Sequence, residues 1–289
     1  MARAFVFASA IFWGLSGGLA GILLTRGWDP LVISYCRGAV GLVVVLVWLG
    51  IVPTDSGLSD PRMWLWSSLA GLGVAGNFTF FFISIAHGSV AVAATLMYTA
   101  PIFVYLISFV LKIEKPTLKK GVAVGLVMIG VVLLTGLAGS GAENVTLVGV
   151  GAGILSGLCY TVFIFAFNYA AKLGSPQAIL TVAFSALVVA LFLPGDGEQI
   201  ALVTESRDWP LFAALGVFGG GGAFILYVIG LEKTPPAVAS VLAMLEPVTA
   251  SLFGVLVLGE SLTSVQLVGM ALVLFAVTGL SAASSGRET

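Results

Sequence analysis

Charged residues are scarce in this chain. Of its 289 residues only 9% are Asp, Glu, Lys or Arg, whereas 59% are apolar. Soluble domains carry roughly 25% charged residues and must cover their surface with polar groups. The scarcity therefore excludes a soluble globular fold and predicts an integral membrane protein. Twelve basic residues nearly balance thirteen acidic ones, so no basic face for nucleic acid is expected.

Residues that bind metals or form disulfides are also few. The chain has two cysteines, Cys36 and Cys159, and one histidine, His87. A structural zinc site usually takes four Cys or His ligands. Both cysteines lie inside apolar runs, which is atypical of a disulfide framework. We therefore expect two buried thiols, no metal site and no cofactor.

Apolar segments of membrane-spanning length make up most of the chain. Crossing about 30 Å of hydrocarbon takes roughly 20 residues at about 1.5 Å each. The first such run is longer than the core of a signal peptide, so we predict a retained helix there. The pattern predicts an all-α integral membrane protein with ten transmembrane helices, near residues 4–24, 31–52, 63–86, 89–111, 118–138, 147–171, 176–194, 209–230, 236–258 and 263–283.

Basic residues are distributed unevenly over the predicted loops. With ten spans, both termini and every second loop share one side of the membrane. The basic residues on that side are Arg3, Arg62, Lys112, Lys115, Lys119, Lys120, Lys172, Lys233 and Arg287. The other side carries only Arg26 and Arg207, and Arg37 lies within the second span. Because basic loops stay in the cytoplasm, both termini are expected to be cytoplasmic.

An internal repeat relates the two halves of the chain at an offset of 146 residues. The offset aligns Pro30 with Pro176, Gly73 with Gly219, Gly76 with Gly222, Pro101 with Pro247, and Glu114 with Glu260. Two five-helix repeats are predicted, over residues 1–143 and 144–289. Because five is odd, the second repeat enters the membrane from the opposite face. Transporters use such inverted repeats to build two gates around one central site.

Two prolines lie near the middle of the fourth and ninth spans. Pro101 and Pro247 each remove a backbone donor and clash with the preceding turn. Such irregular backbone is tolerated at membrane depth where it faces protein or water. Both prolines are candidate hinges beside a substrate site, or ordinary packing kinks. Glycines of the third and eighth spans either permit close packing or leave room for a ligand or for helix sliding: Gly73, Gly76, Gly219 and Gly222.

Polar residues at membrane depth are candidates for a functional site. Glu246, directly before Pro247, could carry a proton, or act as a structural acid that pairs with Arg37 or accepts helix-end donors. Arg37 could extend to the interface, form an ion pair or contact a substrate. The candidate cavity-lining residues are Trp13, Asn77, Met97, Tyr98, Tyr160 and Met244. The two tyrosines could stack on a ligand or hydrogen-bond between helices.

Two stretches resemble the signatures of a known family. AIFWGLSGG in the first span and LAMLEPVTASLFGVLVLGESLTSVQLVGMALVL near the end are similar to the drug/metabolite transporter superfamily, EamA family. The resemblance covers essentially the whole chain, and the chain most resembles the aromatic amino-acid exporter (YddG-type) group. It implies export across the bacterial inner membrane by alternating access, through a cavity formed by spans 1, 3, 4, 6, 8 and 9. One departure is Ala100, which replaces the Glu expected before Pro101.

The charges at depth also restrict the substrate. A phosphorylated substrate needs several basic groups and a strongly cationic one needs several acids, but the spans offer only Arg37 and Glu246. We expect an exporter of neutral or aromatic amino acids, or alternatively of other neutral lipophilic metabolites or drugs. An intramembrane enzyme would need a nucleophile with its base, and a channel would need rings of charge or carbonyls. The sequence shows neither pattern, so both classes are disfavoured. The expected partners are a small-molecule substrate, the lipid bilayer and, optionally, further copies in a homo-oligomer.

Overall fold

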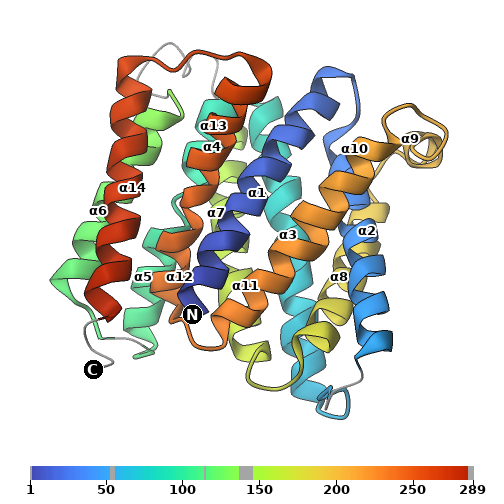
Figure 1. Ribbon diagram of the computed structural model, residues 1–289, viewed down its shortest axis with the longest axis horizontal. Coiled ribbons are helices and arrows are strands. Elements are labelled where there is room, and N and C mark those ends of the chain that lie inside the picture. Colours follow the sequence, from blue (N-terminus) through green and yellow to red (C-terminus); the bar gives the residue numbers. More distant parts are fainter. Residues whose placement is uncertain (1, 53–55, 114, 137–145, 286–289) are drawn as a thin grey trace.

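The chain is described by a computed structural model over residues 2–52, 56–113, 115–136 and 146–285, with side chains described up to residue 280. All regular secondary structure in these ranges is helical (Figure 1). The first half contains α1 (Ala2–Thr25), α2 (Pro30–Ile51), α3 (Pro61–Ala86), α4 (Val90–Met97), α5 (Ala100–Val110) and α6 (Leu118–Leu134). The second half contains α7 (Leu147–Ala170), α8 (Pro176–Phe192), α9 (Gly197–Leu202), α10 (Trp209–Ala214), the π-helical segment η2 (Leu215–Gly222), α11 (Ala223–Leu231), α12 (Pro236–Ala243), α13 (Leu245–Leu258) and α14 (Ser264–Ser285). Glu114 and the predicted repeat boundary at 143/144 lie outside the described residues.

Seven helical stretches are long and apolar enough to cross a membrane: Ala2–Thr25, Pro30–Ile51, Pro61–Ala86, Val90–Val110, Leu147–Ala170, Trp209–Leu231 and Pro236–Leu258. Two shorter apolar helices are Pro176–Phe192 and Ser264–Leu280, and α6 has 17 residues. The chain is therefore a multi-pass membrane protein. Where they are described, the ten ranges expected from hydropathy are mostly helical, and the number of ten spans stays a prediction.

Capping residues and prolines define where several helices begin. Asp29 accepts hydrogen bonds from the backbone nitrogens of Leu31, at 2.8 Å, and Val32, and Pro30 takes the first position of α2. The same sequence of cap and proline begins α3, after Asp60, and α8, after Ser175. Proline suits the first turn because the nitrogen there has no partner within the helix.

The two mid-span prolines follow short breaks in their helices. Pro101 lies in the first turn of α5, after the break that separates α4 from α5 at Tyr98 and Thr99. Pro247 lies in the first turn of α13, after a break at Met244. Each proline stands in the first turn of the following half-helix, where its missing N–H costs little. The two alternatives for both positions, a hinge or a packing kink, stay predictions.

Helix bounds in the two halves differ by the offset found in the sequence. Residues 30, 90 and 118, which begin α2, α4 and α6, lie 146 positions before 176, 236 and 264, which begin α8, α12 and α14. α4 and α12 also end 146 positions apart, at residues 97 and 243. Each helix of the first half therefore has a counterpart, in the order α1–α7, α2–α8, α3 with α10 to α11, α4–α12, α5–α13 and α6–α14.

Helix packing follows the same correspondence. α3 packs along α7, and their counterparts η2 and α11 pack along α1. α3 also packs on α8, and the counterpart pair is η2 on α2. Two further pairs, α2 with α8 and α6 with α14, join a helix to its own counterpart. Each of these contacts thus has an equivalent contact between the counterpart helices. In Figure 1, α1 (dark blue) begins and α14 (red) ends at the lower edge of the bundle.

Candidate functional site

A cavity of about 550 Å³ lies between the two halves of the bundle. Its walls come from α1, α2, α3, α4, α7, α11 and α13, with residues at the end of α6 and Glu260 completing them. Cavities of roughly 300–1,000 Å³ suit small-molecule ligands. The walls include the spans that the family resemblance implied, together with parts of the second and fifth spans.

The cavity extends toward one end of the bundle only. Its lining includes Leu24 near the end of α1, Ile85 near the end of α3, Val90 at the start of α4 and Thr135 just after α6. All four lie at the end where α1 finishes, which is the upper edge in Figure 1. We call this the open end, and the end where α1 begins the closed end.

An aromatic cluster fills the space toward the closed end. Trp13 packs on Tyr227, with ring centroids 4.8 Å apart, and on Phe224, at 5.1 Å. Phe163 and Phe167 complete the cluster, and both Phe167 and Tyr227 are fully buried. Asn168 adds a polar contact there, because its Nδ2 donates to the carbonyl of Leu231 at 3.1 Å. These contacts block passage between the cavity and the closed end.

The counterpart half-helices α4 and α12 differ in their surroundings. All eight residues of α12 are buried, and this half-helix packs on α1, α5, α6, α7 and α14. α4 packs chiefly on α3 and α7, and its first residue, Val90, is 61% exposed. The two halves therefore share a pattern of helix contacts but differ in conformation. At the closed end α12 is buried among its neighbours, whereas its counterpart α4 at the open end borders the cavity.

Charged groups are few in the cavity wall: Arg37, Glu246 and Glu260. Arg37 Nε donates to the carbonyl oxygen of Gly219 at 3.2 Å, and its guanidinium carbon lies 5.1 Å from the centre of the Phe78 ring. Glu246 stands in the first turn of α13, and Glu260 lies at the open end, beyond α13. The wall is otherwise apolar, aromatic or uncharged polar.

Two lining residues carry polar atoms without partners. Trp13 Nε1 and the Tyr160 hydroxyl are buried, and neither has a hydrogen-bond partner within the described chain. A buried donor without a partner costs about 1–3 kcal/mol. Such atoms beside a cavity are suited to bind a polar group of a ligand or water.

The structure places the predicted site residues in two groups. Those that line the cavity are Trp13, Asn77, Met97, Tyr98, Tyr160, Glu246 and Pro247. Those that it places elsewhere are Met244, Pro101, Gly73, Gly76, Gly219 and Gly222. Met244 is fully buried at the break between α12 and α13, because α12 is packed in at the closed end.

Asn77 has a structural role beside its place in the wall. Its Nδ2 donates to the backbone oxygen and the hydroxyl of Ser156, at 3.1 and 3.0 Å, and Ser156 Oγ donates back to the Asn77 carbonyl. These bonds join α3 to α7. Gly73 and Gly76 serve the same contact, since an added Cβ would lie 3.0 Å from Phe163 N or 2.8 Å from Cys159 Sγ.

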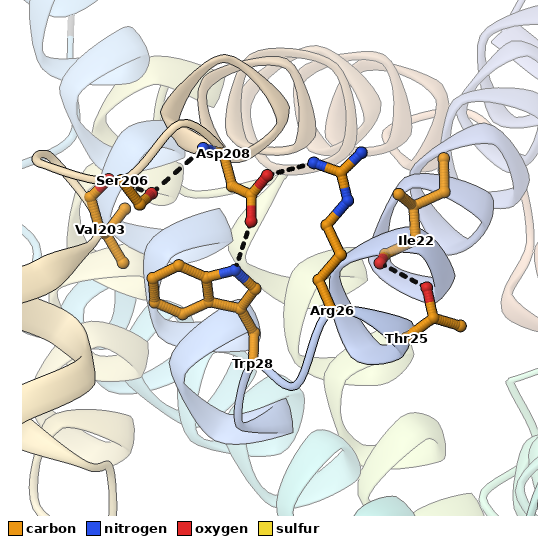
Figure 2. Close-up of polar contacts among 7 residues, drawn as sticks. All are labelled: Ile22, Thr25, Arg26, Trp28, Val203, Ser206 and Asp208. Atoms are coloured by element: carbon orange, nitrogen blue, oxygen red, sulfur yellow. Dashed lines mark hydrogen bonds and ion pairs between the residues drawn. The ribbon is translucent and has the colours of Figure 1, made fainter.

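A polar cluster at the open end ties α1 and α2 to α10 (Figure 2). Asp208 accepts a hydrogen bond from Trp28 Nε1 at 2.8 Å and forms an ion pair with Arg26. The Trp28 hydrogen bond, followed by those of Arg26, lowers the pKa of Asp208 below its ordinary value of 3.8. Nothing in the sequence predicted this cluster, because its members come from loops more than 170 residues apart.

Phe163, Phe224 and Glu260 are among the lining residues that the sequence did not predict. The repeat contained a signal for two of them. Phe163 and Phe224 stand 146 residues after Gly17 and Phe78, which line the cavity as well. Some positions near mid-span that correspond between the halves therefore line the same cavity.

Fold and cavity together define a class: a multi-pass membrane protein built around a central cavity of small-molecule size. The chain belongs to the EamA-like transporter family, which it matches twice, over residues 1–136 and 147–282. A protein of Archaeoglobus fulgidus described as an uncharacterized transporter is 31% identical over 91% of both chains. The threonine/homoserine exporter RhtA of Escherichia coli K12 is 28% identical over 72% of this chain and 68% of its own. A solved crystal structure has the same fold, with 17% identity, a TM-score of 0.79, and coverage of 99% of this chain and 98% of that one.

Proposed function

We propose that this transporter exports small neutral or zwitterionic metabolites, with neutral and aromatic amino acids as the best fit, by alternating access. The observation that carries the proposal is the cavity: it is closed by an aromatic cluster at one end, open at the other, and has few charges. Such a site can hold a solute on one side of a membrane without giving it a continuous path to the other.

The proposal takes the chain as ten spans in two inverted five-helix repeats, 1–143 and 144–289. In support, corresponding helices begin 146 residues apart, and the two family matches are separated by the same offset. The contacts of one half also map onto contacts of the other. An odd number of spans per repeat then requires opposite orientations in the membrane.

The protein is proposed to lie in the bacterial inner membrane with both termini in the cytoplasm. Most basic residues near the helix ends lie at the closed end, for example Lys119 in the first turn of α6, Lys172 after α7 and Lys233 after α11. Basic residues at span ends favour the cytoplasmic side. The cavity then opens to the outside, which is the side that releases an exported solute.

Alternating access is proposed to occur by exchange of the conformations of α4 and α12. In the second state α4 would pack in at the open end, as α12 does now at the closed end, and α12 would border the cavity. The breaks at Tyr98–Thr99 and at Met244, each followed by a proline, lie where these half-helices join the rest of their spans. They are the hinges of the proposal.

The substrate class follows from the wall. Its aromatic residues suit an apolar side chain, whereas Arg37 and Glu246 provide one charge of each sign. An amino acid has both features, and the relative RhtA is named an exporter of two of them. Other neutral lipophilic metabolites or drugs fit the apolar part of the wall and form the second candidate class.

The test is flux from liposomes that contain the purified protein. Vesicles are loaded with individual labelled amino acids, aromatic and aliphatic, and efflux is compared with protein-free vesicles. We expect protein-dependent efflux of at least one neutral amino acid. Other neutral amino acids are expected to compete with it and slow its efflux. Absence of flux for every amino acid, together with efflux of lipophilic drugs, would favour the second class.

A further inference from the structure

We infer that Arg37 and Glu246 bind the two charged ends of one zwitterionic α-amino acid: Arg37 its carboxylate and Glu246 its ammonium group. The inference rests on the proposed function, since it concerns the same cavity. It adds which groups recognise the solute, and it requires that both ends of the solute be free.

Arg37 is fixed in place but is only partly used by the protein. Its Nε donates to the Gly219 carbonyl, and its guanidinium lies over the Phe78 ring. The two terminal nitrogens have no hydrogen-bond partner in the described chain. They offer a planar fork of N–H donors, the geometry that binds a carboxylate through two parallel hydrogen bonds.

Glu246 is equally available. It lines the cavity from the first turn of α13, and among the described residues no donor hydrogen-bonds to its carboxylate. A carboxylate has acceptor sites on both oxygens, which suits the three donors of an ammonium group. The acid therefore provides the complement of Arg37 within the same space.

The two groups do not neutralise each other directly. Both side chains line the same cavity, but within the described chain they form no ion pair at 4.0 Å or less. A partly buried charge without a hydrogen-bonded partner is unfavourable. A zwitterion between them supplies a partner of opposite charge for each side chain. Its net charge of zero equals the summed charge of Arg37 and Glu246.

The rest of the wall accommodates the side chain. Trp13, Phe163 and Phe224 form an apolar surface in the wall of the same cavity. The unpartnered Trp13 Nε1 and Tyr160 hydroxyl are available for one polar group of that side chain. Because the ammonium and carboxylate groups of the amino acid are bound separately from its side chain, the cavity would accept amino acids with different side chains.

The test compares three forms of one transported amino acid in the liposome assay: the free acid, its primary amide, and its N-acetyl derivative. We expect the wild-type protein to prefer the free acid over each derivative by at least tenfold. Arg37→Gln should lose the preference over the amide and keep that over the N-acetyl form. Glu246→Gln should show the reverse. Arg37→Lys keeps the charge and should retain the order of preference with weaker binding.

Two control variants, Arg62→Gln and Glu232→Gln, remove one positive and one negative charge at exposed positions of the closed end. Both should keep the wild-type selectivity. Thermal melting verifies that each variant is folded. Efflux of free acid and amide at equal rates by the wild-type protein would overturn the inference while leaving export intact. Glu246→Gln that loses pH dependence but still rejects the N-acetyl form would also overturn it, by making Glu246 a proton carrier. No efflux of any amino acid would instead contradict the proposed function.

Discussion

At the residue scale, glycines of η2 determine where Arg37 lies. A Cβ on Gly219 would come within 2.3 Å of Ser16 Cβ and 3.3 Å of Arg37 Nε, and one on Gly220 within 2.3 Å of the Arg37 carbonyl. The backbones of α2 and η2 are therefore nearly in contact. π-Helical turns inside α-helices often occur at functional sites, and here the turn presents the Gly219 carbonyl to Arg37.

Gly219→Ala should therefore displace both Ser16 and Arg37. Overpacking of this kind costs about 1–3 kcal/mol, so we expect a lower melting temperature and slower efflux. Gly151→Ala is the matched control, because no atom lies within 4 Å of the added Cβ in α7. Equal melting temperatures for Gly219→Ala and the wild type would show that Ser16 of α1 and the Arg37 side chain make room for the added methyl group at no cost.

The Asn77–Ser156 contact makes a second prediction at this scale. Hydrogen bonds between membrane helices contribute on average about 0.6 kcal/mol and at most about 1.7 kcal/mol in double-mutant cycles. Asn77→Ala and Ser156→Ala should each destabilise the protein, and the double variant should be less destabilised than their sum. Additive effects would show that Asn77 acts through the cavity and not through α7.

Asp208 makes the third prediction, on pH dependence. Its pKa is lowered in the folded protein, chiefly by the Trp28 hydrogen bond and then by Arg26. Its stabilising contribution is therefore complete above the ordinary aspartate pKa of 3.8 and is lost as the pH falls through the lowered value. The difference in melting temperature between wild type and Asp208→Asn should shrink below about pH 4. A constant difference down to pH 2 would exclude the carboxylate as its source.

At the scale of elements, the two ends of the cavity differ because the repeats carry different side chains at matching positions. Phe163 and Phe167 of α7 fill the closed end, whereas their counterparts 146 residues earlier are Gly17 and Gly21 of α1, which line the cavity. Large rings exclude water from the closed end, and glycines leave the other end empty. The side chains at these positions thus favour the state in which the cavity extends to the end of the bundle where α1 finishes.

Changing these positions should shift the balance between the two states. Phe167→Ala removes a fully buried ring from the closed end, so we expect the closed end to open more often. Maleimide labelling of a cysteine placed at Val238, buried in α12, should then become faster. Gly21→Ala, which meets no atom within 4 Å, is the control and should leave that rate unchanged. A Phe167→Ala variant with unaltered labelling would contradict the role of the ring.

At the scale of the molecule, sequence reasoning succeeded where the signal was periodic or repeated. Apolar runs located the helices, and the offset anticipated that corresponding helices begin 146 residues apart. It did not anticipate η2, because four consecutive glycines carry no side-chain pattern. The predicted lining also included Met244, which is fully buried outside the cavity wall, whereas its counterpart Tyr98 lines the cavity. The halves adopt different conformations, so equivalent residues have different surroundings, and one sequence pattern cannot describe both.

The central claim is that the halves exchange conformations during transport. At the closed end Asn168 contacts Leu231; the counterparts at the open end are Ile22 and Ile85, and the Ile85 side chain borders the cavity. The most direct measurement is bismaleimide cross-linking of Ile22→Cys with Ile85→Cys in a chain lacking Cys36 and Cys159. We predict that the cross-link forms faster while the protein transports its substrate, and that it then stops efflux. A cross-link that never forms during sustained efflux, or one that leaves efflux unchanged, would contradict the claim.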